Sequence, residues 1–231
     1  MQLLLARRVC DHRLPDCVTF VAATNRRQDR AGVSGLLEPV KSRFVTILGI
    51  EPDLDSWCAW AYQAGLPGEL IAFLRFRPEL LHQFEPTPEI VNTPSPRTWA
   101  NVGKLLQAGI PDGLEFPCIN GAVGEAAAIE FVSFLDTWRD LPSPDAILID
   151  PENGPTPEAP STLYAICVAL AKRAATTTFG RIAKYAMRLN DAGHGEFATL
   201  LLRDSLRQCP AIRSTADFAV MAASPLGHLY S

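Results

Sequence analysis

Residues 18–25 read VTFVAATN, a continuous apolar and β-branched run that ends in two polar residues. A run of this kind is typical of a strand that is buried on both faces, as in a parallel sheet. Asn25 stands just past the carboxyl end of the predicted strand, where open α/β sheets place their ligands. A second apolar run, FVTILGI at residues 44–50, stops before Pro52 and predicts another strand. The sequence therefore predicts part of an α/β unit here.

The apolar spacing becomes helical from residue 53 onward. Leu54, Trp57, Cys58 and Ala61 recur at i, i+3, i+4 and i+7, the spacing of one helix face. Further helices are predicted at 67–81 with an interruption at Pro78, and at 97–108, 123–138, 161–174, 177–190 and 194–208. Two buried strands do not make a stable sheet alone. The predicted fold class is therefore an α/β remnant, the last strands of a parallel sheet, followed by a mostly α-helical remainder.

Composition indicates an ordinary globular chain of 231 residues, with 48% hydrophobic and 20% charged side chains. This excludes a mainly disordered protein, and the longest apolar run is far short of the roughly 20 residues of a membrane helix. The apolar run at residues 3–5 precedes the basic pair Arg7-Arg8, the reverse of a secretory signal, so we expect a cytoplasmic location. Residues 1–50 carry eight basic and four acidic side chains, whereas the whole chain has a net charge of −4.

Cysteines and histidines give no metal-binding pattern. The six cysteines contain no C-x-x-C pair, and the four histidines lie far apart with no H-E-x-x-H motif. We therefore expect reduced, buried or half-buried cysteines and no metal site.

Four segments, taken in order, resemble the second half of an AAA+ ATPase of the MoxR type. Residues 7–15 resemble the hairpin that follows the Walker B strand, and residues 18–25 resemble the strand that ends in the sensor 1 residue. The segment EPVKSRF at 38–44 resembles the short helix that carries the arginine finger, and TPSPRTW at 93–99 resembles the start of the lid helix with the sensor 2 arginine. The resemblance covers roughly residues 1–140.

This resemblance implies roles for three residues. Asn25 matches sensor 1 and would orient the attacking water. Arg43 matches the arginine finger, and Arg97 the nucleotide-binding lid arginine. Each has a plain structural alternative: an Asx-turn at a strand end for Asn25, a surface salt bridge for Arg43, and a solvent-facing first-turn position for Arg97. The resemblance also implies three regions: residues 1–52 as the end of the AAA+ α/β core, 53–140 as a helical lid domain, and 141–231 as a proline-rich strap with a helical extension.

The chain departs from the family at its two nucleotide-holding motifs. No G-x-x-x-x-G-K-[ST] loop occurs, and the one Gly-Lys pair, Gly103-Lys104, falls within a predicted helix. The Walker B strand is also absent; the nearest candidate, residues 146–152, is interpreted as a short strand or loop. We therefore expect a carboxyl-terminal fragment of a MoxR-like ATPase that uses ATP and Mg²⁺ in its full-length form but is inactive alone.

The family resemblance further implies a homo-oligomeric ring and a partner with a von Willebrand factor A domain, with no membrane or nucleic-acid partner. A different class of function stays open: a helical protein-interaction or adaptor module that never binds nucleotide. The absence of a phosphate loop favours this alternative, as does the net negative charge of residues 51–231. A Ser-His-Asp hydrolase is disfavoured because no G-x-S-x-G motif occurs.

Overall fold

A computed structural model describes residues 2–24, 38–84, 89–111, 113–224 and 226–227. The chain divides into two units, one formed by residues 1–51 with 84–89 and the other by residues 52–83 with 90–231. The fold is mostly helical, and the described ranges contain one small sheet. None of the helices in these ranges is long and apolar enough to cross a membrane.

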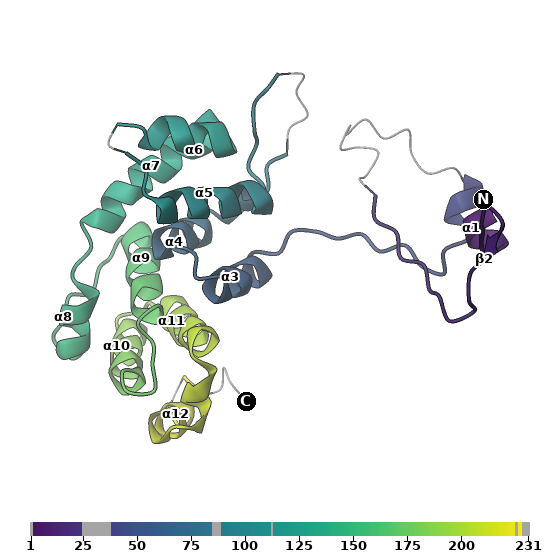
Figure 1. The fold of residues 1–231 in the computed structure, drawn as a ribbon. Coiled ribbons are helices and arrows are strands. Elements are labelled where there is room, and N and C mark those ends of the chain that lie inside the picture. Colours follow the sequence, from purple (N-terminus) through teal and green to yellow (C-terminus); the bar gives the residue numbers. More distant parts are fainter. Residues whose placement is uncertain (1, 25–37, 85–88, 112, 225, 228–231) are drawn as a thin grey trace. The chain divides into compact units, whose positions relative to one another are not determined.

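The first unit opens with the short helix α1 (Gln2–Leu5) and a hairpin (Figure 1). Strands β1 (Arg8–Val9) and β2 (His12–Arg13) pair antiparallel, with Arg8 opposite Arg13 and Val9 opposite His12. The hairpin predicted within residues 7–15 is therefore confirmed.

Arg7 ties this hairpin to the segment that follows it. Its guanidinium donates hydrogen bonds to the carbonyl oxygens of Pro15 at 2.8 Å and Val18 at 2.6 Å. The same group lies 5.7 Å from the centroid of the Phe20 ring, within the range of a cation–π contact. These contacts fix the path of the chain between the hairpin and residue 20.

The parallel strands expected at 18–23 and 44–50 are not formed. Neither segment is helix or strand, and several of their apolar side chains face solvent: Val21 is 94% exposed, Val45 105% and Ile50 85%. Phe20 and Phe44 are half-buried. The physical reason is that a strand satisfies its backbone groups only through a neighbouring strand. The strand pairing seen in the described ranges is that of β1 with β2. The short helix α2 (Glu38–Lys41) lies between them in the sequence, within residues 38–44, where the resemblance implies a short helix.

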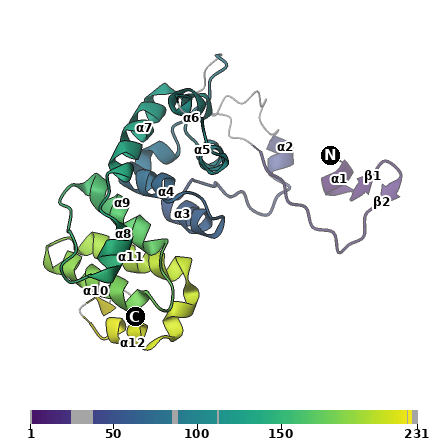
Figure 2. The same ribbon diagram turned by 60° about the vertical axis from the view of Figure 1, so that its left-hand side comes forward.

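The second unit is helical throughout its described part (Figures 1 and 2). Its elements are α3 (Leu54–Gln63), α4 (Gly68–Phe76), the 3-10 helix η2 (Pro78–Leu81), α5 (Pro96–Ala108), α6 (Glu115–Val123), α7 (Glu125–Arg139), α8 (Pro144–Ile149), α9 (Pro160–Ala171), α10 (Phe179–Asp191), α11 (Gly195–Gln208), the 3-10 helix η3 (Pro210–Ser214) and α12 (Ala216–Ala222). The seven helical segments predicted after residue 53 are confirmed within a few residues, whereas α6, α8 and α12 were not predicted.

Capping side chains explain where several of these helices begin. Asp53 accepts a hydrogen bond from the Ser56 amide at 2.8 Å and caps α3. Ser95 and Thr98 form a reciprocal capping box at the start of α5, with Pro96 in its first turn. Ser143 caps α8, so the interpretation of residues 146–152 as a strand or loop is wrong for 146–149, which are helical, whereas 150–152 follow the helix as its C-cap and a turn.

Helices α4 and α9 form the centre of the core. Eight of the twelve residues of α9 are buried, and α4 packs along it. An apolar helix surface on all sides is typical of a helix enclosed by others. Phe73 of α4 stacks against Trp99 and Phe131, with ring centroids 5.5 and 4.9 Å away. The two expected regions, 53–140 and 141–231, therefore share one core: α4 belongs to the first region and α9 to the second.

Candidate functional site

The predicted nucleotide-site residues are exposed where the structure describes them. Asn25 lies outside the described residues. Arg43 follows α2, exposed, with its main-chain amide donating to the Val40 carbonyl at 3.2 Å. Arg97 is the second residue of α5 and is also exposed. Neither guanidinium pairs with another described group. Arg43 belongs to the first unit and Arg97 to the second.

Gly103-Lys104 is confirmed as a mid-helix pair in α5 and not a phosphate loop. Gly103 is buried, and a Cβ atom built on it would lie 3.0 Å from Leu66 Cδ2 and 3.1 Å from Leu70 Cδ2. The glycine therefore allows α5 to approach α4 and the loop before it closely.

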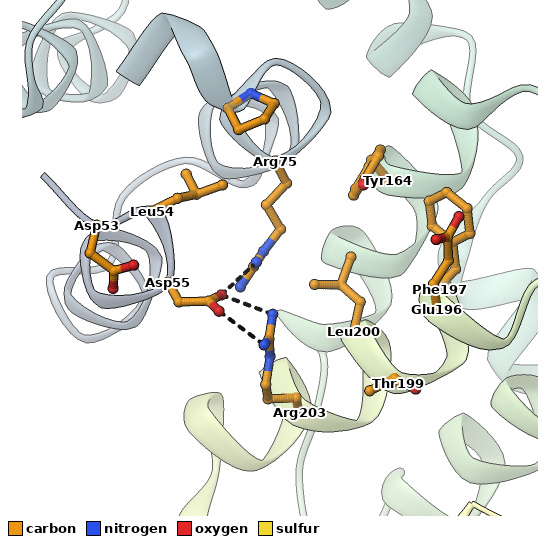
Figure 3. A pocket seen from close by; sticks show the side chains of 11 residues that line it. Asp53, Leu54, Asp55, Arg75, Tyr164, Glu196, Phe197, Thr199, Leu200 and Arg203 are labelled. Carbon is orange, nitrogen blue, oxygen red and sulfur yellow. Dashed lines mark hydrogen bonds and ion pairs between the residues drawn. The ribbon is translucent and has the colours of Figure 1, made fainter. Parts of the chain in front are cut away.

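A pocket of about 460 Å³ opens between α3, α4, α9 and α11 in the second unit (Figure 3). Its apolar lining comes from Leu54, Pro78, Phe197 and Leu200, and its polar lining from carboxylates, guanidinium groups and hydroxyls of the same helices. The volume lies within the range of small-molecule and peptide side-chain sites. This pocket is the candidate functional site, and no sequence motif indicated it.

Asp55 of α3 is the polar centre of one wall. Arg203 of α11 donates to both of its carboxylate oxygens, Nη1 at 3.0 Å and Nη2 at 2.8 Å, in the bidentate geometry typical of arginine (Figure 3). Arg75 of α4 donates to the same carboxylate at 3.1 Å. Burial alone would raise the pKa of Asp55, but the hydrogen bond from Arg75 and the charges of Arg203, Arg75 and Arg207 lower it. Asp55 is therefore ionised and joins three helices.

Asp204 lies behind this wall and is 1% exposed. Its carboxylate accepts hydrogen bonds from Arg75 Nη2 at 2.7 Å, the Tyr62 hydroxyl at 3.1 Å and Arg207 Nη1 at 3.4 Å. Burial raises the pKa of Asp204, and the charges of Arg75 and Arg207 act against that rise. Burial lowers the pKa of Arg75, but the negative charge of Asp204 more than offsets it, so the net pKa of Arg75 is raised. Arg75 is therefore a permanent buried cation.

Two carboxylates of the pocket lining, Asp53 and Glu196, form no ion pair with a described residue, although the charge of Arg207 contributes to lowering the pKa of Asp53. Asp53 accepts the Ser56 amide as the helix cap, which together with the side chain of Ser56 lowers its pKa. Glu196, in the first turn of α11, is exposed and forms no ion pair with a described residue. Because Arg75 and Arg203 are already bound to Asp55, the unneutralised charge that faces the pocket is negative.

An aromatic pair forms the opposite wall. Tyr164 of α9 and Phe197 of α11 meet edge to face, with ring centroids 4.8 Å apart. The Tyr164 hydroxyl makes no hydrogen bond with any group in the described part of the chain. Burial raises the pKa of Tyr164, and the negative charge of Glu196 adds to that rise. The Glu196 carboxylate is therefore close enough to the Tyr164 side chain for its charge to raise the pKa of that hydroxyl.

The sequence analysis did not find this site because the residues that pair with one another in it are far apart in the chain. Arg75 and Asp204 are 129 residues apart, and Arg203 and Asp55 are 148 apart. The available signal was the cluster Arg203, Asp204 and Arg207 within the helix predicted at 194–208, where these side chains alternate with leucines. Charged side chains on such a face are seldom buried unless they are paired.

Cysteines and metal ligands give no second site. All six cysteines are free: Cys58 and Cys167 are buried, and Cys118 and Cys209 are half-buried. Cys10 and Cys17 are exposed, so the expectation of burial is wrong for these two, because the hairpin and the segment after it are too small to cover them. No cluster of three or more His, Cys, Asp or Glu side chains arises among the described residues.

Comparison with family models, with curated proteins and with solved structures finds no match to this chain.

Proposed function

We propose that the chain acts as the carboxyl-terminal part of a MoxR-like AAA+ ATPase. The observation that carries the proposal is that two segments rich in β-branched and apolar residues, 18–24 and 44–50, are neither helix nor strand and expose Val21, Val45 and Ile50. Exposed apolar surface costs about 25 cal/mol per Å² relative to burial, so segments of this composition favour a covering sheet. Strands supplied by the other half of an AAA+ core would provide that cover.

The order of elements around these segments supports the same proposal. The hairpin of β1 and β2 precedes residues 18–24, and the short helix α2 precedes residues 44–50. A helical unit follows, with Arg97 exposed in the first turn of α5. This is the succession that the resemblance to the MoxR type implies.

The proposed roles are those of residues that act on a nucleotide held elsewhere. Arg43 would place a positive charge at the phosphates, Arg97 would contact them from the helical unit, and Asn25 would orient the attacking water. The residues of this chain do not fit a complete site for ATP and Mg²⁺, since the phosphate loop and the Walker B carboxylates are missing from the sequence. We propose that both bind only in the completed ATPase, which would assemble as a homo-oligomeric ring beside a von Willebrand factor A domain partner.

The test is a chimera in which the amino-terminal half of an active MoxR ATPase, ending after its Walker B strand, is fused to Met1. We expect the chimera to hydrolyse ATP. Arg43→Ala is expected to lower kcat by about 10³–10⁵-fold, the range measured for arginine fingers. Arg97→Ala is expected to weaken nucleotide binding, because a forked guanidinium–phosphate contact would be lost.

Arg181→Ala is the matched control, since Arg181 is an exposed arginine of α10 with no predicted role. Calorimetry with ATP shows independently whether the fused phosphate loop has folded. A chimera that binds ATP, but whose hydrolysis is the same with Arg43→Ala as with Arg181→Ala, contradicts the proposal.

A helical interaction module without nucleotide binding is the second candidate. The observation that favours it is a second unit with its own continuous core, which holds together without any nucleotide-binding element. This candidate predicts that neither Arg43→Ala nor Arg97→Ala has any effect in the chimera, while a protein ligand still binds the isolated chain.

A further inference from the structure

We propose that Asn153 is a site of spontaneous deamidation and that Asp150 controls the rate of this modification. Two Asn-Gly pairs occur in the chain, Asn120-Gly121 and Asn153-Gly154. The inference goes beyond the proposed ATPase role, because residues 150–156 take no part in that role. It depends only on contacts within the second unit.

Deamidation of an Asn-Gly pair needs no enzyme, and its co-reactant is water. The main-chain nitrogen of the glycine attacks the side-chain Cγ of the asparagine, and the side-chain nitrogen leaves as ammonia with the proton of the glycine N–H. Water then opens the resulting succinimide ring at one of its two carbonyl carbons, which gives aspartate or isoaspartate. Glycine favours the attack because it has no side chain to crowd its nitrogen.

The two Asn-Gly pairs differ in their local structure. Asn120 and Gly121 lie within α6, where the helix fixes the backbone. Asn153 is exposed in the turn that follows α8, and Gly154 is half-buried beside it. The attack requires the backbone to rearrange until the glycine nitrogen reaches Cγ. A surface turn opens more readily than the interior of a helix, so Asn153 is the asparagine that reacts in the folded protein.

Asp150 holds both reacting groups of this pair. The Asn153 side-chain Nδ2 donates to both carboxylate oxygens of Asp150, each at 3.1 Å, and its main-chain amide donates to Oδ1 at 3.2 Å. The Gly154 amide donates to the Asp150 main-chain carbonyl at 2.9 Å. Succinimide formation requires the side chain to leave the carboxylate and the Gly154 nitrogen to leave the carbonyl. The Asp150 contacts therefore slow the reaction.

Helix α10 holds the same turn from the other side. Arg188 donates from Nη1 to the carbonyl oxygens of Pro151 at 2.8 Å and Gly154 at 3.0 Å. The Tyr185 hydroxyl donates to the Pro155 carbonyl at 2.8 Å. The main chain on both sides of Asn153 is thus bound to α10, and a change of the Asn153 backbone alters these contacts.

The product of the reaction does not fit the turn. A carboxylate at position 153 would replace a donor that now lies 3.1 Å from both oxygens of the Asp150 carboxylate, so two like charges would meet and two hydrogen bonds would be lost. Isoaspartate also adds one carbon to the main chain and displaces Gly154 from Arg188. Deamidation at Asn153 is therefore expected to loosen residues 150–156 from α10.

Peptide mass spectrometry of the full chain, incubated at mildly alkaline pH, tests the site and its control by Asp150. In the native chain we expect deamidation at Asn153 before Asn120, and at least about tenfold more slowly than at Asn153 in the urea-unfolded chain. Asp150→Ala is expected to remove most of that protection, with Asn120 in the same digest as the internal control. Earlier reaction of Asn120, or a rate at Asn153 that Asp150→Ala leaves unchanged, would overturn the inference.

Asp150→Asn keeps the comparison decisive if Asp150→Ala unfolds the whole chain and accelerates Asn120 equally. An asparagine at position 150 retains one side-chain oxygen acceptor, so the rate at Asn153 should lie between those of the native and the urea-unfolded chain. The native rate in this folded variant would then overturn the role of Asp150.

Asn153→Asp tests the consequence, because it carries the product's charge from the start. Hydrogen–deuterium exchange is expected to show at least about tenfold lower protection of the amides of residues 152–154 than in the native chain. Asn101→Asp, an exposed position of α5, is the matched control and should leave that protection unchanged. Equal protection in Asn153→Asp and the native chain would contradict the loosening of this turn.

Discussion

Arg75 Nη2 lies 2.7 Å from Asp204 Oδ1, and both side chains are buried, at 4% and 1% exposure. The pair joins α4 to α11 across 129 residues of sequence. Asp55 of α3 accepts a hydrogen bond from Arg75, and Tyr62 of α3 donates one to Asp204, so α3, α4 and α11 are held together by polar contacts as well as by the shared core. This network forms one wall of the candidate site and fixes its shape.

Asp204→Ala is expected to destabilise the protein by about 3–5 kcal/mol, because it leaves the Arg75 cation buried without its closest partner. Urea unfolding followed by circular dichroism measures the change. Asp136→Ala removes an exposed carboxylate that pairs with Arg139, and it is expected to cost less than about 1 kcal/mol. A loss for Asp204→Ala no larger than that for Asp136→Ala would show that the buried pair contributes little.

Stability is expected to fall in acid partly through Asp55. Its pKa is lowered in the folded protein from the ordinary 3.8, so the carboxylate stabilises the fold above that value, and this contribution is lost as the pH falls below it. The difference in unfolding free energy between the native chain and Asp55→Asn should therefore shrink between about pH 6 and about pH 3. A difference that stays constant over this range would show that the arginines do not hold Asp55 ionised.

Gly121 and Gly124, three residues apart, are expected to respond oppositely to substitution by alanine. Gly124, between α6 and α7, has a φ of +84°, and a Cβ there would lie 2.9 Å from the Asn92 carbonyl oxygen. Gly124→Ala should cost about 1–3 kcal/mol. Gly121 lies within α6 with nothing near its Cβ position, so Gly121→Ala should be neutral or stabilise by up to about 1 kcal/mol. Thermal unfolding measures the stability of both variants. A Gly124→Ala variant that is more stable than the native chain would contradict the positive φ at this residue and its close approach to Asn92.

Thiol labelling is expected to separate the cysteines by burial. Cys10 and Cys17 are exposed and should react with a maleimide in the folded protein. Cys58 and Cys167 are buried, and burial raises the pKa of Cys58 to about 12, so both should react only after unfolding. Mass spectrometry of labelled peptides with and without denaturant gives the result. Rapid labelling of Cys58 or Cys167 under native conditions would contradict the packing of α3 and α9.

The helices could be predicted from sequence wherever a local pattern sets them. The capping box at Ser95 and the apolar spacing from Leu54 to Ala61 are contained in a few neighbouring residues, and these helices are observed. Helix α8 was missed because its proline-rich surroundings predict a connector. Pro144 instead stands in the first turn of this helix. The strands at 18–23 and 44–50 were predicted from composition alone, and composition does not show whether a pairing partner exists.

The candidate site was beyond the reach of sequence patterns for a different reason. Its walls depend on which helices become neighbours, and that is decided by the burial of α4 and α9 as a whole. Of the residues that were predicted as functional, Arg43 and Arg97 are exposed and stay predictions, as does Asn25. The charged pairs of the pocket carry no local motif that would have marked them.

Hydrogen–deuterium exchange of residues 18–24 and 44–50 tests the central claim most directly, with the isolated chain compared with the chimera that carries the amino-terminal half of a MoxR ATPase. If these segments are strands of a shared sheet, their amides exchange rapidly in the isolated chain and become protected by about 100-fold or more in the chimera, while α9 is protected in both. Rapid exchange of both segments in a chimera that binds ATP would contradict the account.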